Sequence, residues 1–137
     1  MPSGITFCTA INCMDGRVQL PVIEYLKCRF GVDYVDEVSE AGPVLYLAEE
    51  PDSFETRSIL RRVDVSVDKH GSHAIALAAH HDCAGNPVDE TRQREQLQTG
   101  LWLLRERYPM AEIIGLWVDR NWSVCEVVPE TTGAGPR

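Results

Sequence analysis

Three short apolar runs, separated by longer amphipathic segments, constrain the fold of this chain more than any other feature. The runs are residues 5–11, 73–79 and 113–118, and each is apolar at most positions. Runs of this length and composition are typical of strands buried on both faces of a parallel sheet. A further strand is predicted over residues 123–128, and too few residues precede it for a crossover helix. We therefore expect this last strand to pair antiparallel with the strand before it.

Amphipathic segments between the runs predict three helices, over residues 21–30, 54–69 and 89–108. The Val-Asp-Val-Ser-Val end of the second segment also fits strand alternation, so a strand there is an alternative. A weaker strand is predicted over residues 34–38. The order β-α-β-α-β-α-β-β predicts an α/β fold whose sheet is mostly parallel, with about four parallel strands. An antiparallel C-terminal strand and helices on both faces complete this fold.

The length of 137 residues is that of one domain, which we expect to cover residues 1–128. Residues 129–137 are rich in Thr, Gly and Pro, and they predict a disordered tail. The sequence has neither a membrane-length apolar stretch nor the basic start of a signal peptide. We therefore expect a cytoplasmic protein without a membrane partner. A net charge of -8 repels phosphate backbones, which makes nucleic acid a poor candidate partner.

Five cysteines are present, an odd number in a chain that shows no export signal. This count argues against a framework of disulfides and leaves reduced thiols as buried apolar groups or metal ligands. Three of them lie within predicted apolar strands or helices, and we expect these three in the core: Cys8, Cys28 and Cys125. The other two, Cys13 and Cys83, lie in loops that follow predicted strands.

Two short motifs carry residues with metal-binding chemistry. Cys13, Asp15 and Arg17 form a C-x-D-x-R pattern after the first strand, and His80 and Cys83 form an H-x-x-C pattern after the third. Ligands of open α/β sheets bind outside the carboxyl ends of the strands, where both motifs lie. Two thiolates and an imidazole select zinc over magnesium or calcium. Three protein ligands leave a fourth position for water, as in catalytic zinc sites.

Asp15 and Arg17 are two residues apart and can pair beside the metal. In that arrangement the arginine keeps the carboxylate charged and aimed at the zinc-bound water. Two other interpretations stay open. The pair is only a surface ion pair, or Asp15 binds the metal itself and closes the site. His81 is an alternative to His80 as the histidine ligand.

The paired motifs resemble the zinc signature of the β-class carbonic anhydrases. The segment from residue 54 through the sequence A-I-A-L-A-A-H-H-D-C-A-G resembles the helix, strand and zinc loop of that family. Residues 113–119 and 123–127 are similar to its closing hairpin, and residues 39–42 stand where the family has an Ala-Gly loop. The resemblance therefore covers about residues 5 to 128.

The resemblance implies a zinc enzyme, a lyase that hydrates carbon dioxide reversibly to bicarbonate through zinc-bound hydroxide. It assigns Zn2+ to Cys13, His80 and Cys83, and it makes Asp15 and Arg17 the catalytic pair. It also implies a homo-oligomer, a dimer or higher, that acts on a small-molecule substrate. Two alternatives are a zinc hydrolase of carbonyl sulfide or carbon disulfide, and a non-catalytic zinc-binding module whose site is closed by Asp15.

Some features depart from the pattern of the family. The first ligand is already residue 13, so we expect a short, divergent member that lacks the N-terminal arm of the usual dimer. Gly16 stands in place of the usual Ser, and Glu40 and Pro43 change the Ala-Gly loop. Trp122 lies in a tight polar turn, where we expect it to contact a partner.

Overall fold

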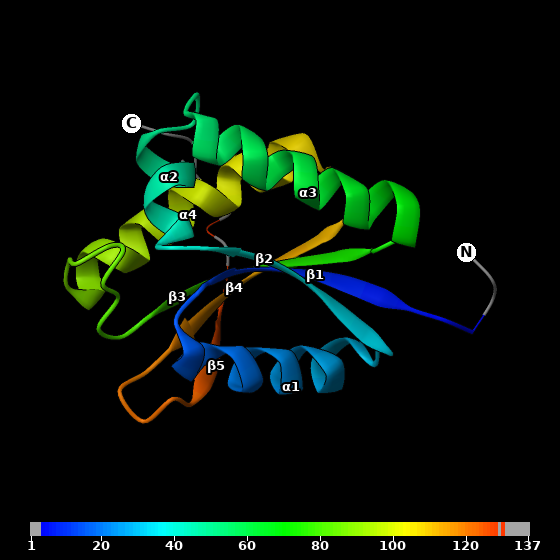
Figure 1. Ribbon diagram of the computed structural model, residues 1–137, viewed down its shortest axis with the longest axis horizontal. Coiled ribbons are helices and arrows are strands. Elements are labelled where there is room, and N and C mark those ends of the chain that lie inside the picture. Colours follow the sequence, from blue (N-terminus) through cyan, green and yellow to red (C-terminus); the bar gives the residue numbers. More distant parts are fainter. Residues whose placement is uncertain (1–3, 129, 131–137) are drawn as a thin grey trace.

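A five-stranded sheet forms the centre of the computed structural model, which describes residues 4–128 and 130 (Figure 1). Its strands are β1 (Phe7–Cys13), β2 (Tyr34–Glu40), β3 (Ala74–His80), β4 (Glu112–Val118) and β5 (Val124–Val127). They lie in the order β2-β1-β3-β4-β5. The first four are parallel, and β5 pairs antiparallel with β4. The predicted α/β fold with its antiparallel C-terminal strand is confirmed.

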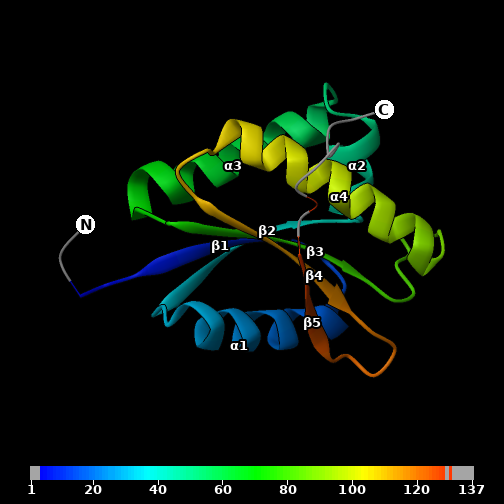
Figure 2. The ribbon, with the colours of Figure 1, turned by 180° about the vertical axis from the view of Figure 1, so that it is seen from behind.

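Helices cover both faces of the sheet, as predicted (Figures 1 and 2). One face is covered by α1 (Gln19–Phe30), and the other by α2 (Pro43–Glu49), α3 (Phe54–His70) and α4 (Glu90–Arg107). A 3-10 turn, η1 (Gly16–Val18), leads from β1 into α1. Both faces of the central strands are therefore buried, which explains why their sequences are apolar at almost every position.

Small residues let the helices lie close to the central strand. The alternate alanines of β3 belong to the core that forms under α1, together with Val22 and Leu26. On the opposite face, a Cβ added at Gly100 of α4 would lie 2.7 Å from Leu77 Cδ2 of β3. The close approach of α4 fixes the position of β3, whose carboxyl end carries His80, a predicted metal ligand.

The Val-rich segment after residue 54 is helical, so the strand alternative for its end was wrong. Ser53 Oγ accepts a hydrogen bond from Thr56 N at 3.1 Å and caps the start of α3. A strand would place Val63 and Val65 on one face. In the structure Val63 is fully buried, whereas Val65 is 51% exposed. Helical spacing therefore decides which of these valines packs on the sheet.

One short helix was not predicted from the sequence, and the predicted start of another was wrong. A seven-residue helix, α2, begins at Pro43, where no helix was predicted. Gly42 precedes it with φ of 59°, and Pro43 suits the first helical turn. Only Pro43, Val44 and Leu47 are buried along α2, so its apolar pattern is too short to recognise by periodicity. The first helix begins at Gln19 rather than at residue 21.

The expected burial of three cysteines is only partly right. Cys8 is buried, but Cys28 and Cys125 are exposed. Val22 and Leu26 define the buried side of α1, and Cys28 lies on its solvent side. Cys125 lies on the edge strand β5, which leaves much of its surface open to water. All five cysteines are free thiols in the structure.

The predicted disordered tail, residues 129–137, lies outside the described residues apart from Glu130. The extent of the domain over residues 1–128 stays a prediction. Across the described residues, none of the helices combines the length and apolar character needed to cross a lipid bilayer.

Glu37 of β2 is an acid in an unfavourable position. Its Oε1 accepts a hydrogen bond from Asn12 Nδ2 at 3.3 Å, but its Oε2 is buried and finds no partner among the described residues. Burial raises the pKa of this carboxyl above its ordinary value of 4.5, and the bond from Asn12 only partly opposes the effect. The ionised form of Glu37 therefore opposes folding at neutral pH.

Glu37→Gln is expected to stabilise the protein at pH 7 by about 1 kcal/mol, because it removes a poorly solvated charge. The folded-state pKa lies above the unfolded-state pKa, so the cost of ionisation vanishes as the pH falls below the unfolded value. The gain should therefore disappear in urea unfolding at low pH. Glu24→Gln, at an exposed position of α1, is the matched control and should change little. An equal gain at both pH values would contradict this explanation.

Candidate metal centre

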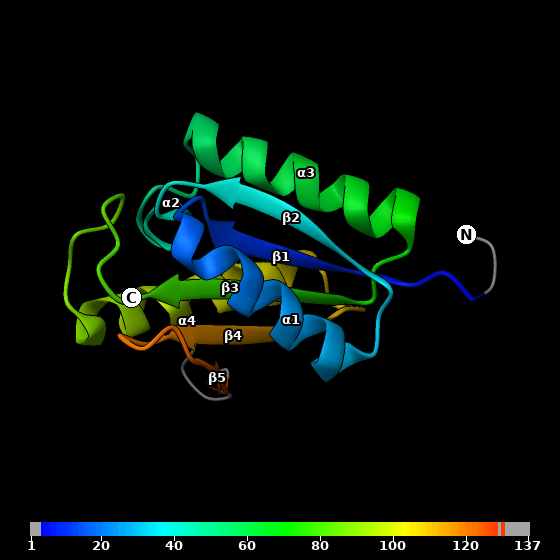
Figure 3. The same cartoon turned by 60° about the horizontal axis from the view of Figure 1, so that its bottom comes forward.

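The two predicted motifs meet at the carboxyl ends of β1 and β3. Cys13 is the last residue of β1 and His80 is the last residue of β3. These two strands are parallel neighbours, and Figure 3 shows their ends side by side at one edge of the sheet. Cys83 follows in the loop after β3. The topology alone thus brings together residues that are far apart in the sequence.

Cys13, His80 and Cys83 form a buried cluster. Their ligand atoms all lie within 4.8 Å of one another, and this is the group with metal-binding potential among the described residues. The two Sγ atoms are 3.9 Å apart. Two thiolates bound to one tetrahedral zinc ion, at about 2.3 Å each, would be about 3.8 Å apart. The spacing of the thiols therefore fits a zinc ion without rearrangement.

The His80 ring is oriented by its neighbour in the loop. Its Nδ1 lies 2.7 Å from the carbonyl oxygen of His81, so Nδ1–H donates, and in the neutral ring Nε2 then keeps its lone pair. Nε2 is buried and has no hydrogen-bond partner within the described part of the chain. Metal-binding histidines commonly show this arrangement, in which one ring nitrogen is fixed and the other faces the ion. His81 itself is exposed and lies outside the cluster.

The thiols of Cys13 and Cys83 are hydrogen-bonded to each other. A hydrogen bond from the Cys83 thiol holds the pKa of Cys13 well below its usual range, although burial opposes the shift. The same contact, together with burial, raises the pKa of Cys83. The contact between the two sulfurs therefore favours a thiolate at this site, which is the form that binds metals. A bound cation would release the remaining proton from Cys83.

Asp15 and Arg17 form a two-pronged ion pair beside the cluster. Arg17 Nη2 lies 2.7 Å from Asp15 Oδ2, and Arg17 Nε lies 3.0 Å from Asp15 Oδ1. The backbone N–H of Arg17 also donates to Oδ1 at 2.9 Å. Chiefly because of the side-chain hydrogen bonds from Arg17, the pKa of Asp15 is lowered to about 2. The carboxylate is therefore ionised throughout the physiological range.

Two side-chain amides, one half-buried and one buried, hold the backbone of the proposed ligand residues, and neither belongs to the predicted motifs. Gln19 Nε2 donates to the carbonyl oxygen of Cys13 at 2.7 Å. Gln93 Nε2 donates to the carbonyl oxygen of His80 at 2.9 Å, and Gln93 is 2% exposed. A polar residue on the buried side of α4 was the available signal for Gln93. Both amides contact backbone carbonyl groups, so neither forms part of a metal-binding sequence pattern.

The loops around the cluster are packed backbone against backbone. A Cβ added at Gly42 would lie 2.7 Å from the carbonyl carbon of Gly85, and a Cβ at Gly85 would lie 2.7 Å from the carbonyl carbon of Ala41. No side chain fits at either position. Beside the cluster the remaining cavity is about 10 Å³, and Pro43 and Val44 help to line it. The space is close to what a single water molecule needs.

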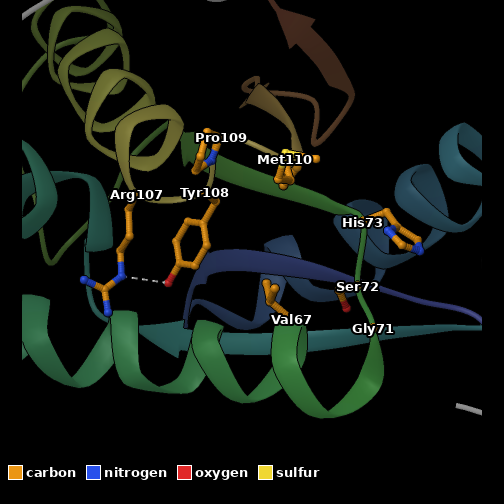
Figure 4. Close-up of a pocket in the computed structure, with 9 residues that line it drawn as sticks. Val67, Gly71, Ser72, His73, Arg107, Tyr108, Pro109 and Met110 are labelled. Carbon is orange, nitrogen blue, oxygen red and sulfur yellow. Dashed lines mark hydrogen bonds between the residues drawn. The ribbon is translucent and has the colours of Figure 1, made fainter.

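Larger hollows lie at the opposite end of the strands. One of about 350 Å³ is lined by Val67, Ser72 and Tyr108 among others (Figure 4). It lies between the segments that lead into β3 and β4, and Arg107 Nε donates to the Tyr108 hydroxyl at its side. None of the five site residues predicted from the motifs lines it. The hollow is therefore separate from the candidate metal centre.

A family model described as "Putative carbonic anhydrase" matches residues 3–128. The chain belongs to this carbonic anhydrase family. The resemblance to β-class carbonic anhydrases inferred from the motifs is thereby confirmed. No curated protein sequence matches the chain.

Solved β-carbonic anhydrases share the fold at low sequence identity. A carbonic anhydrase from Glaciozyma antarctica is 14% identical with a TM-score of 0.58, over 88% of this chain and 81% of that chain. One of two tetrameric β-carbonic anhydrases from Sordaria macrospora is 14% identical with a TM-score of 0.57, over 93% and 83% of the two chains. Wild-type CafD of Aspergillus fumigatus is 13% identical with a TM-score of 0.58, over 92% and 91%. At these identities the likeness shows the fold alone.

Proposed function

We propose that this protein is a zinc-dependent carbonic anhydrase that hydrates carbon dioxide reversibly to bicarbonate. The observation that carries the proposal is the buried cluster of Cys13, His80 and Cys83, in which the lone pair of His80 Nε2 has no other partner among the described residues. The donor set of two sulfurs and one nitrogen suits zinc. Membership of the carbonic anhydrase family supports the reaction.

Zinc bound by three protein ligands supplies a nucleophile near neutral pH, since it lowers the pKa of water to about 7. The side chains around it have distinct tasks in this proposal. Asp15, ionised and held by Arg17, accepts a hydrogen bond from the attacking water and orients it. Gln93 and Gln19 keep the backbone of the ligand residues fixed. The side chains of Pro43 and Val44 make the space beside the cluster small and apolar.

The contacts of Asp15 favour an open site over one closed by its carboxylate. Both carboxylate oxygens already accept hydrogen bonds from Arg17. The cluster among the described residues comprises Cys13, His80 and Cys83, without Asp15. A fourth position is thus left for water, as in catalytic zinc sites. This argues against the non-catalytic module considered above.

The substrate is tested by comparing three small linear molecules on zinc-loaded protein: carbon dioxide, carbonyl sulfide and carbon disulfide. The proposal predicts that carbon dioxide is turned over with the highest kcat/KM. Faster hydrolysis of either sulfur compound would support the alternative of a related zinc hydrolase. Both reactions would use the same zinc ligands. The comparison therefore tests the substrate and does not test the ligand assignment.

The assembly and the compartment belong to the same proposal. The Sordaria macrospora proteins are described as tetrameric, and we propose that this chain also forms a homo-oligomer, a dimer or higher. Light scattering of the purified protein measures this directly, and a monomer at micromolar concentration would contradict it.

Five free thiols suit a reducing compartment, so we propose that the protein works in the cytoplasm.

A further inference from the structure

We propose that Trp122 is a positioning residue of the site, which holds the Arg17 guanidinium in the place where it pairs with Asp15. The inference rests on the proposed function, because it assigns Trp122 to the same Asp15–Arg17 pair. The guanidinium carbon of Arg17 lies 4.4 Å from the centre of the Trp122 ring. This is the geometry of a cation–π contact. The tryptophan expected to contact a partner thus contacts Arg17 of its own chain.

The turn between β4 and β5 is shaped so that the indole lies against Arg17. Trp122 has φ of 62°, in the left-handed region that bulky residues rarely adopt. Asp119 stabilises this conformation by accepting hydrogen bonds from the backbone of the turn. Its Oδ1 accepts hydrogen bonds from the backbone N–H groups of Asn121 and Ser123, at 2.8 Å and 3.0 Å, and its carbonyl oxygen accepts from Trp122 N at 2.9 Å. Residues with strained backbone conformations that are stabilised by such contacts are often found at functional sites.

Arg17 needs this support because its side chain is 45% exposed. An exposed ion pair is weak, since water screens it and the long side chain loses rotamer freedom on pairing. Trp122 covers one face of the guanidinium. At the edge of the guanidinium, Arg17 Nη1 lies 3.3 Å from the Asp82 carboxylate, and Arg17 Nη2 lies 3.2 Å from the Asp82 carbonyl oxygen. The guanidinium is thus bounded by Asp15, Asp82 and Trp122.

Three loops therefore meet at one side chain. Arg17 belongs to the loop after β1, Asp82 to the loop after β3 and Trp122 to the turn after β4. Asp82 lies between His80 and Cys83, and its own φ of 59° turns its carbonyl oxygen to where Arg17 reaches it. Fixing Arg17 consequently fixes Asp15 relative to the segment from His80 to Cys83, which carries two of the proposed ligands.

Trp122→Leu tests the proposal, because leucine keeps an apolar side chain but has no π face. Two properties of the full-length, zinc-loaded protein are measured. The first is the NMR signal of the Arg17 Nε–H group and its exchange with water, which does not depend on activity. The second is the split of kcat and KM for carbon dioxide hydration. Trp122→Phe should restore part of the loss, and Trp102→Leu, at another half-buried tryptophan on α4, is the matched control.

Faster exchange of the Arg17 Nε–H in Trp122→Leu, with kcat reduced roughly three- to thirtyfold and KM unchanged, is the expected result. Zinc content and the unfolding midpoint should stay close to those of the parent protein. An Arg17 Nε–H that stays protected in Trp122→Leu would overturn the proposal, as would equal changes in Trp102→Leu. If the parent protein hydrates no carbon dioxide, the proposed function fails, and the exchange of the Arg17 signal still decides the role of Trp122.

Discussion

Cys83→Ala is expected to abolish stoichiometric zinc binding and to lower the free energy of unfolding. The substitution removes one of the three proposed ligand atoms, and the Sγ of Cys13 loses the thiol that lies 3.9 Å away. A ligand that binds only the folded state stabilises it by about 2.7 kcal/mol when its free concentration is 100 times Kd. The variant should lose this zinc-dependent stabilisation. Zinc content is measured by elemental analysis, and stability by urea unfolding with and without a chelator.

Cys28→Ala provides the matched control for the loss of a thiol. Cys28 is exposed on α1, so its removal should leave both zinc content and the effect of the chelator unchanged. If Cys83→Ala retains one zinc ion per chain, the assignment of Cys83 as a ligand is wrong. If both variants lose zinc equally, the loss reflects damage to the fold rather than to the metal centre.

Arg17→Ala should remove most of the turnover while zinc stays bound. Arg17 contributes no ligand atom, but its guanidinium and backbone N–H donate to both oxygens of Asp15. Without it the carboxylate is free to turn away from the water or toward the metal. Groups that orient a metal site typically change activity by about 10- to 100-fold, and we expect kcat/KM to fall by that amount. The unfolding midpoint should change little, because an exposed ion pair is a weak stabiliser.

Two further variants define what Arg17 does. Arg17→Lys keeps the charge but cannot form the two-pronged contact, so it should recover little activity. Arg120→Ala removes another exposed arginine, in the β4–β5 turn, and should keep full activity. Full activity in Arg17→Ala would remove the Asp15–Arg17 pair from the proposed mechanism. Loss of zinc in that variant would instead make the pair part of metal binding.

Most elements of the fold could be predicted because their signals are local. The run at residues 73–79 is apolar at nearly every position, and the strand β3 lies there with all seven residues buried. Helical spacing of Ile59 and Val63 likewise identifies the buried side of α3. The metal-binding motifs are local as well, since each is read within five residues, and parallel pairing of β1 with β3 explains why they meet.

Features that depend on contacts between distant segments could not be predicted. The short helix α2 begins where the backbone of Gly42 packs against that of Gly85. The sequence of residues 41–49 contains no local signal of that contact. Cys28 was expected in the core because the helix around it is apolar, yet its position on α1 points to solvent. The contact between Trp122 and Arg17 joins two loops that only the folded sheet brings together. The roles of the five predicted site residues stay predictions.

The central claim is tested most directly by stopped-flow hydration of carbon dioxide across pH, on protein whose zinc content has been assayed. We predict turnover that rises with pH through one apparent pKa of about 7, the value set by zinc-activated water. The activity should be absent from chelator-treated protein and return with added zinc. Absence of turnover at full zinc occupancy would contradict the proposed carbonic anhydrase function.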